Sequence, residues 1–157
     1  MNISFTTDRN PVLLARLNRT VHNKHAFDHP DVFKPHKQDE MEKWFRTFLQ
    51  RENVFPVIMV VEGEAIGYAL LEHQIPHPQS PHHQPEHEVI FVDQMSIEPA
   101  YQNQGYGLKL MDYIKRFAHR RGVKKIQLDV WSDNAQGKAF YLKAGFSTYR
   151  EMMEINL

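Results

Sequence analysis

The stretch Gln102-Asn103-Gln104-Gly105-Tyr106-Gly107 follows an apolar run of strand type, Val89 to Ile97. It precedes a helical pattern that places Leu110, Ile114 and Phe117 on one face. A strand, a glycine-bearing turn and a helix N-terminus together form an anion site, because the first N–H groups of a helix have no internal partner and the helix dipole adds positive potential. The two glycines let the backbone approach a phosphate without an intervening Cβ. We therefore expect a ligand with a pyrophosphate group at this turn.

Composition restricts the classes of protein to which the chain can belong. It has 157 residues, of which 41% are hydrophobic and 24% charged, as in a globular domain large enough to bury a core. Its formal net charge is zero. That balance argues against a nucleic acid bound by bulk electrostatics and gives no reason to expect a membrane surface as partner. We expect a single domain over residues 1–157 with neither partner.

Absent residue types and segments exclude further classes. The chain contains no cysteine, which rules out disulfides, thiolate metal sites and a cysteine nucleophile. The N-terminal residues Met1–Phe5 lack the basic region and apolar run of a signal peptide, and no apolar run approaches membrane-spanning length. The expected location is the cytoplasm.

Periodicity and turn residues predict six strands and four helices in the order β-α-α-β-β-β-α-β-α-β. Such an order is typical of a mixed α/β sheet with helices on both faces. Proline-containing segments at 25–37 and 74–87 are predicted loops. The predicted strands are 3–6, 56–61, 65–71, 89–97, 126–130 and 146–155, and the predicted helices begin at Pro11 and cover 39–51, 105–121 and 135–144.

Two motifs carry a resemblance to a known family. The spacing is not that of the GxGxxG fingerprint, and the chain has no GxxxxGK[ST] loop. Gln102-x-x-Gly105-x-Gly107 resembles the Q/R-x-x-G-x-G/A signature of the GNAT superfamily of N-acetyltransferases. Downstream, Leu128–Asn134 followed by Ala139–Phe146 is similar to the strand, Asn, helix, Tyr and Gly-Phe ending of that family. The resemblance covers roughly residues 57–150, whereas the first 55 residues share only the layout.

The resemblance implies a fold and a co-substrate. The GNAT fold has a mixed central sheet, here of about six strands flanked by about four helices, in which two central strands splay apart and acyl-CoA enters between them. Residues 57–150 would form the acetyl-CoA-binding core and residues 1–55 the acceptor side, with no metal. The residues implied for acetyl-CoA are Met95, Ser96 and Ile97 along the pantetheine, Gln102, Asn103, Gln104, Gly105, Tyr106, Gly107 and Leu108 around the pyrophosphate, and Asn134 and Tyr141.

Tyr141 is the expected general acid, on the strength of the resemblance. In the family a Tyr at this motif position protonates the leaving thiolate, and the matching Asn, here Asn134, bonds the pantetheine or a nearby water. The pattern alone favours another interpretation, a buried aromatic beside Phe140 and Leu142. A phenol with pKa near ~10 can give its proton to a thiolate whose conjugate acid lies near ~8.5 only with assistance from the site.

Two carboxylates are candidates for the general base. Asp129 is the first, because it is predicted to lie mid-strand opposite Ile126, Leu128 and Val130, and N-terminal acetyltransferases of ribosomal proteins, which this region resembles, have a Glu at the matching position. Asp93 is the second, because an acid inside an apolar strand requires a reason. Either residue is also interpretable as a structural carboxylate bonded to backbone or to a cation.

Several further features have more than one interpretation. Histidines 77, 82, 83 and 87 invite a metal site, but the surrounding prolines and glutamines favour a solvated loop that faces substrate. His25, His29 and His36, with Trp44 and Phe45, fall where the family builds its acceptor site, although those aromatics are more simply core. Gly137, inside a predicted helix, either admits a close approach of cofactor or substrate or is neutral.

The sequence therefore predicts an N-acetyltransferase that moves the acetyl group of acetyl-CoA to a primary amine by direct attack in a ternary complex. The acceptors considered are a polyamine, an aminoglycoside-like antibiotic, an amino-acid derivative and a protein N-terminus. A non-catalytic acyl-CoA sensor is the alternative, and transfer of a longer acyl group is a weaker one. A homodimer is possible, since many relatives form dimers.

Overall fold

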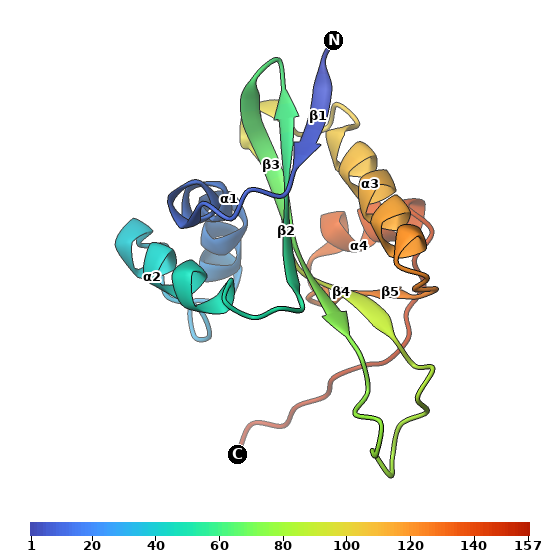
Figure 1. Cartoon of the computed structure of the whole chain (residues 1–157). Coiled ribbons are helices and arrows are strands. Elements are labelled where there is room, and N and C mark those ends of the chain that lie inside the picture. Colours follow the sequence, from blue (N-terminus) through green and yellow to red (C-terminus); the bar gives the residue numbers. More distant parts are fainter.

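A five-stranded sheet separates two helical layers in the computed structural model, which describes residues 1–157 (Figure 1). The strand order is β1-β2-β3-β4-β5, and all neighbours are antiparallel except β4 and β5, which are parallel. This is the mixed α/β sheet predicted from the sequence. The strands are β1 Ile3–Thr6, β2 Val54–Val61, β3 Glu64–Gln74, β4 Val89–Ile97 and β5 Ile126–Gln127.

Two helices cover each face of the sheet (Figure 1). On one face lie α1 (Pro11–Asp28) and α2 (Gln38–Phe48), and on the other lie α3 (Tyr106–Arg120) and α4 (Ala135–Lys143). α1 begins at Pro11 as predicted, and the Asn10 side chain caps it by accepting hydrogen bonds from the N–H groups of Val12 at 3.0 Å and Leu13 at 3.3 Å. No helix combines the length and apolar character needed to cross a bilayer.

The two faces of β3 supply both hydrophobic cores. Tyr68 and Leu70 are fully buried against the α1–α2 layer, whereas Ala69 and Leu71 are fully buried against the α3–α4 layer. Because successive side chains of a strand point to opposite faces, a strand covered on both sides reads as a continuous apolar run. β3 also continues beyond its predicted end at Leu71 to Gln74, because residues 72–74 pair with residues 89–91 of β4.

The pairing of β4 changes along its length. Its parallel contact with β5 is limited to Ile90 opposite Ile126 and Phe91 opposite Gln127. On its other edge, Val92 faces Leu71 and Gln94 faces Leu70, so Asp93 is the extra residue of a β-bulge. Beyond Phe91, β4 therefore has one hydrogen-bonded neighbour, β3, and its second edge is open. This is the splay that the resemblance implies.

Three sequence predictions are corrected by the structure. β5 ends at Gln127 instead of Val130, because β4 has diverged and offers residues 128–130 no partner. The predicted last strand, 146–155, is absent, which leaves five strands instead of six. The first helix continues to Asp28, into the segment predicted as loop, because no proline interrupts it before Pro30.

Candidate active site

The turn between β4 and α3 has an unusual backbone. Asn103 and Gly105 both have positive φ, 60° and 85°, and Gly105 is the N-cap of α3. The side chains of the two flanking glutamines hold the turn: Gln102 Nε2 donates to the carbonyl of Ile97 at 2.8 Å, and Gln104 Nε2 donates to the carbonyl of Ala100 at 2.9 Å. Gly105 is thus required by conformation, since a side chain at its φ would be strained.

This turn presents a row of free donors. The backbone N–H groups of residues 103–108 make no hydrogen bond within the chain, and the first bond of α3 runs from Lys109 N–H to the carbonyl of Gly105 at 3.2 Å. Residues 103–105 are exposed, while Leu108 is half-buried. Consecutive free N–H groups at the positive end of a helix dipole form an anion cradle. The stretch that the sequence assigned to pyrophosphate therefore has the donors that a pyrophosphate needs.

Gly107 also has a role in packing. A Cβ at this position would lie 3.0 Å from the Phe140 ring, closer than an ordinary carbon contact. The glycine therefore lets the first turn of α3 pack against α4. This contact joins the anion cradle directly to the helix that carries Tyr141.

The open edge of β4 leads into the cradle. Met95, Ser96 and Ile97 pair with β3 on one side, opposite Ala69, Tyr68 and Gly67, and have no strand on the other. Ser96 is buried. An extended ligand with amide groups can add to such an edge as an extra strand. Several predicted binding residues surround one core cluster between β4, α3 and α4, namely Met95, Ile97, Tyr106, Leu108 and Tyr141.

Tyr141 lies in the last turn of α4 with its ring half-buried between the rings of Phe140 and Phe146, at centroid distances of 5.2 and 5.7 Å. Burial raises the pKa of its phenol. The hydroxyl has no hydrogen-bonding partner in the chain. It is not one of the unpartnered polar atoms that are fully buried, so a ligand or water can reach it. A protonated phenol with a free hydroxyl is in the form that a proton donor needs.

Asn134 and Gly137 act as a pair at the start of α4. The Asn134 side chain caps the helix by accepting from the Gly137 N–H at 3.0 Å. A Cβ on Gly137 would lie 2.5 Å from Asn134 Nδ2. The Asn134 side chain folds back over the start of α4 and leaves no room for a Cβ at position 137. This packing explains the glycine, so substitution of Gly137 is not structurally neutral. The Asn134 amide N–H₂ donates no hydrogen bond within the chain.

Asp93 and Asp129, the two candidate bases, lie close enough to influence each other electrostatically. Burial, followed by repulsion from Glu72, raises the Asp93 pKa to about 6, partly opposed by Arg51, and Asp129 adds a smaller upward effect. Asp93 is exposed at the surface, but the protein around its carboxylate still removes part of the water that would stabilise the charge. Asp129 lies outside β5 and is exposed, which corrects its predicted mid-strand position.

Two buried polar side chains, Asn18 of α1 and Glu72 of β3, were missed in the sequence. Asn18 of α1, 3% exposed, donates to the hydroxyl of Tyr68 at 3.0 Å and to Gln94 Oε1 at 3.2 Å, and the Tyr68 hydroxyl donates to the same oxygen at 2.6 Å. Glu72, 7% exposed, pairs with Arg51 at 2.8 Å. Glu72 could have been found in the sequence, because it is an acidic residue at the end of an apolar strand. No sequence pattern indicates that Asn18 is buried.

An aromatic cluster joins the N-terminal layer to the segment before α4. His29 stacks on Trp131 with ring centroids 3.9 Å apart, and its Nε2 lies 3.1 Å from Asp133 Oδ1. Phe33 contacts the same Trp131 edge to face. Burial lowers the pKa values of His25 and His36. Of the aromatics considered for the acceptor side, Phe45 is fully buried, whereas Trp44 is 38% exposed and stacks on Phe48.

The segment from Ile75 to Glu88 contains no helix or strand, in agreement with the predicted loop. No group of three or more His, Cys, Asp or Glu side chains converges in the structure as metal ligands would. His83 Nδ1 instead lies 3.2 Å from the Ser80 hydroxyl.

Comparison with known proteins agrees with this geometry. Residues 18–146, most of the chain, match the sequence model of the Acetyltransferase (GNAT) family. The chain belongs to this family. It is also 30% identical over 133 residues to a mycothiol acetyltransferase of Saccharomonospora viridis, in a match that covers 80% of this chain and 40% of the relative. The GNAT chain thus spans less than half the length of that protein.

Solved structures show the same GNAT fold at low sequence identity. A tetramutant of the BH1408 protein from Bacillus halodurans superposes with a TM-score of 0.87 at 23% identity, covering 100% of both chains. The aminoglycoside acetyltransferase AAC(6')-Iy, in complex with a bisubstrate analogue of coenzyme A and acetylneamine, superposes with a TM-score of 0.72 at 15% identity, covering 100% of this chain and 99% of that one.

Proposed function

We propose that the protein is an N-acetyltransferase that binds acetyl-CoA between β4 and α4 and transfers the acetyl group to a primary amine. The observation that carries this proposal is the row of free N–H groups of residues 103–108, directly after the open edge of β4. The cradle would hold the pyrophosphate, with Gln102, Asn103, Gln104, Gly105, Tyr106, Gly107 and Leu108 around it. Met95, Ser96 and Ile97 would bind the pantetheine amides, with Asn134 as a further polar contact.

The reaction requires two proton transfers. The amine nitrogen attacks the thioester carbonyl, a C–N bond forms, and collapse of the tetrahedral intermediate breaks the C–S bond. The thiolate of coenzyme A takes its proton from the Tyr141 hydroxyl, which has no hydrogen-bonding partner in the chain. Because burial raises the pKa of this phenol, the site must assist the step by stabilising the phenolate or by concerted transfer. The proton lost by the amine passes to a carboxylate, and we assign Asp93 this role in preference to Asp129. A base works best with a pKa near the operating pH, and Asp93, at about 6, meets that condition.

The acceptor is an amine that reaches this carboxylate from the α1–α2 side. Glu72 and Asp129 both lie close enough to Asp93 to raise its pKa, and this group of carboxylates favours a cationic amine over a neutral or acidic molecule. One relative is named a mycothiol acetyltransferase and one structural neighbour an aminoglycoside N-acetyltransferase. Because these names point to different molecules, the acceptor class of this protein is to be found by experiment. A small molecule and a peptide N-terminus are both compatible with a site between the α1–α2 layer and the α3–α4 layer.

The function is tested in two steps. Binding of coenzyme A is measured by calorimetry, with pantetheine, which lacks the pyrophosphate, as the matched control ligand. Thiol release from acetyl-CoA is then measured with polyamines, aminoglycosides, amino acids, N-terminal peptides and lysine peptides. Acceptor-dependent release with one class supports the enzyme and names the substrate. Tight binding without release from any class would favour a non-catalytic acyl-CoA sensor, and absence of binding would overturn the site itself.

A further inference from the structure

Three polar side chains from different elements meet on the face of the sheet that α1 covers. Asn18 of α1 donates from Nδ2 to the Tyr68 hydroxyl at 3.0 Å and to Gln94 Oε1 at 3.2 Å, and the Tyr68 hydroxyl donates to the same Oε1 at 2.6 Å. Asn18 is 3% exposed and Tyr68 is fully buried, whereas Gln94 of β4 is half-buried. Two deeply buried side chains thus hold one end of a side chain that reaches the surface.

These contacts fix the direction in which the Gln94 amide points. The distance of 2.6 Å to the Tyr68 hydroxyl is ordinary for an O–H···O hydrogen bond and short for one that involves nitrogen, so the atom beside Tyr68 is Oε1. Turning over both amides would move the Asn18 N–H₂ to the place of its Oδ1, which is fully buried and has no partner. Buried donors without an acceptor are less well tolerated than a carbonyl oxygen without a donor. The Gln94 Nε2 is therefore turned away from the cluster.

The two N–H groups on Gln94 Nε2 are free beside the proposed base. They donate no hydrogen bond within the chain, and Nε2 is not one of the unpartnered polar atoms that are fully buried. Gln94 pairs with Leu70, which packs in the core on the α1–α2 side, and it follows Asp93 directly. Burial raises the pKa of the Tyr68 phenol, and Asp93 adds a smaller upward effect, so the Asp93 carboxylate lies near this cluster.

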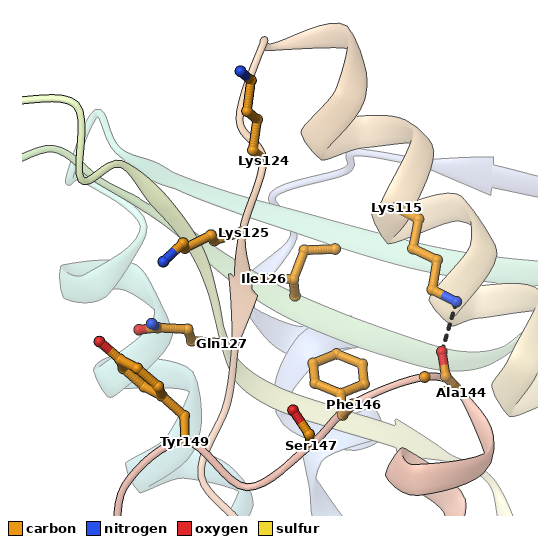
Figure 2. Close-up of a pocket in the computed structure, with 10 residues that line it drawn as sticks. Lys115, Lys124, Lys125, Ile126, Gln127, Ala144, Phe146, Ser147 and Tyr149 are labelled. Carbon is orange, nitrogen blue, oxygen red and sulfur yellow. Dashed lines mark hydrogen bonds between the residues drawn. The ribbon is translucent and has the colours of Figure 1, made fainter.

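A cavity at the β5 edge is the competing place for an acceptor, and its charge is unsuitable. It has a volume of about 370 Å³, and Lys115, Lys124 and Lys125 are among its lining residues (Figure 2). Three ammonium groups repel a further cation. A cationic amine is therefore expected at the carboxylates beside Gln94 and not in this cavity.

The chemistry of a carboxamide nitrogen restricts what can bind beside it. The –NH₂ group donates two hydrogen bonds and accepts none, so its partner on the acceptor is an oxygen atom with a lone pair. A polyamine at neutral pH is mostly protonated and presents N–H donors, which would leave both Gln94 donors unpaired. A site that hydrogen-bonds one group of its substrate discriminates against analogues that lack that group.

We propose that Gln94 determines the acceptor class, because its Nε2 donates to a carbonyl or hydroxyl oxygen next to the primary amine that reacts. Asn18 and Tyr68 are positioning residues that hold the Gln94 amide in this direction. The inference rests on the proposed acetyl transfer and narrows it from amines in general to amino-alcohol, amino-acid or peptide amines.

Matched pairs of small amines test this assignment. Glycinamide is compared with isobutylamine, and ethanolamine with propylamine, so that one member of each pair has the same skeleton without the oxygen. Gln94→Met and Gln94→Glu both remove the N–H₂ donors, and the second keeps an oxygen for Asn18 and Tyr68. The ratio of kcat/KM within each pair should fall by about 3- to 10-fold in both variants, chiefly through the KM of the oxygen-bearing amine. Tyr68→Phe, which releases the amide, should lower the ratio in the same direction.

The control for these variants is Gln74→Met, the same substitution at an exposed glutamine at the end of β3, which should keep the wild-type ratios. Equal losses for both members of a pair would assign Gln94 a structural role only and overturn the proposal. A wild type that acetylates putrescine in preference to every oxygen-bearing amine would overturn it as well.

A second measurement does not depend on turnover. The side-chain amide resonances of Gln94 are identified in heteronuclear NMR spectra by their absence from Gln94→Met. Addition of glycinamide or ethanolamine should shift them, and addition of isobutylamine should not. A shift without thiol release from any amine would refute acetyl transfer and retain Gln94 as the donor that binds the amine. Resonances that respond to neither oxygen-bearing amine would overturn the assignment of Gln94, whatever the turnover.

Discussion

At the scale of single residues, the site depends on how the surroundings change the proton affinity of two groups. Burial raises the pKa of the Tyr141 phenol, so the group is protonated at neutral pH but is a weaker acid than a free tyrosine, and it gives up its proton only with assistance from the site. Burial and Glu72 raise the pKa of Asp93 to about 6, so the carboxylate remains charged at neutral pH but binds a proton more readily than an ordinary aspartate. An acid and a base with displaced pKa values are typical of sites where protons move.

The Asp93 assignment predicts a pH dependence. The value of kcat/KM should fall as pH drops through about 6, because only the ionised carboxylate accepts a proton. Asp93→Asn should lower kcat by about 10²- to 10⁴-fold and abolish this acidic limb. Asp129→Asn is the matched control and should retain the limb. If Asp129→Asn loses the limb and Asp93→Asn keeps it, the roles are reversed.

The same substitution should have the opposite effect on stability. The folded pKa of Asp93, about 6, lies above its ordinary 3.8, so the folded chain loses stability relative to the unfolded chain as pH rises between these values. Asp93→Asn should therefore raise Tm at pH 8, and the gain should shrink as pH falls toward 4. A Tm that drops at pH 8 would show that Asp93 is held by a stabilising partner instead.

Gly137 carries a prediction about the α4 cap. Gly137→Ala should push the Asn134 side chain off the helix end, because the new Cβ would lie 2.5 Å from its amide nitrogen. Loss of an N-cap costs about 1 kcal/mol, partly offset by the higher helix propensity of alanine. Thermal unfolding should show a Tm at or below that of wild type, and a clear rise in Tm would contradict the cap.

At the scale of elements, the position of β4 depends on the close approach of β3 along its paired edge. A Cβ on Gly67 would lie 2.6 Å from Ile97 Cδ1 and 2.8 Å from the Ser96 carbonyl oxygen. Glycine here lets the strand that would bind the pantetheine lie flat against its neighbour. Close backbone contacts thus position the anion cradle, the open edge and α4. The pattern of side chains in the sequence gives little indication of these contacts.

Gly67→Ala should therefore separate β3 and β4 locally. Overpacking of this kind costs about 1–3 kcal/mol, or a fall in Tm of roughly 2–10 °C for a chain of this size. Adding Ile97→Val removes the atom at 2.6 Å but leaves the backbone oxygen, so it should restore part of the loss. Full recovery in the double variant would mean that the backbone contact is unimportant.

The elements also show what a sequence can reveal. The α/β layout, the β2–β3 hairpin and the turn at 102–107 follow from local patterns, because glycines, caps and apolar periodicity act over a few residues. The extent of β5, the missing strand at 146–155 and the bulge at Asp93 depend on which strands meet. The contacts of Asn18 with Tyr68 and Gln94 join residues up to 76 positions apart, and no local pattern indicates them.

At the scale of the whole molecule, the ligand would add contacts between elements that are far apart in the sequence. Coenzyme A in the gap would contact β4, the start of α3 and α4 at once, which otherwise meet through contacts such as Gly107 with Phe140. At a concentration of 100 Kd it should stabilise the fold by about 2.7 kcal/mol, and thus raise Tm by roughly 5–10 °C. Pantetheine at the same concentration should raise Tm much less, and an equal rise would contradict the pyrophosphate cradle.

The most direct test of the account is the turnover of Tyr141→Phe. With the best acceptor from the panel and saturating acetyl-CoA, the rate of thiol release by this variant should fall by about 10²- to 10⁴-fold relative to wild type. Its Kd for coenzyme A should change by no more than about twofold, because only the hydroxyl is removed. A variant that retains the wild-type kcat would contradict the assignment of Tyr141 as the acid, and with it the proposed direction of proton flow across the gap between β4 and α4.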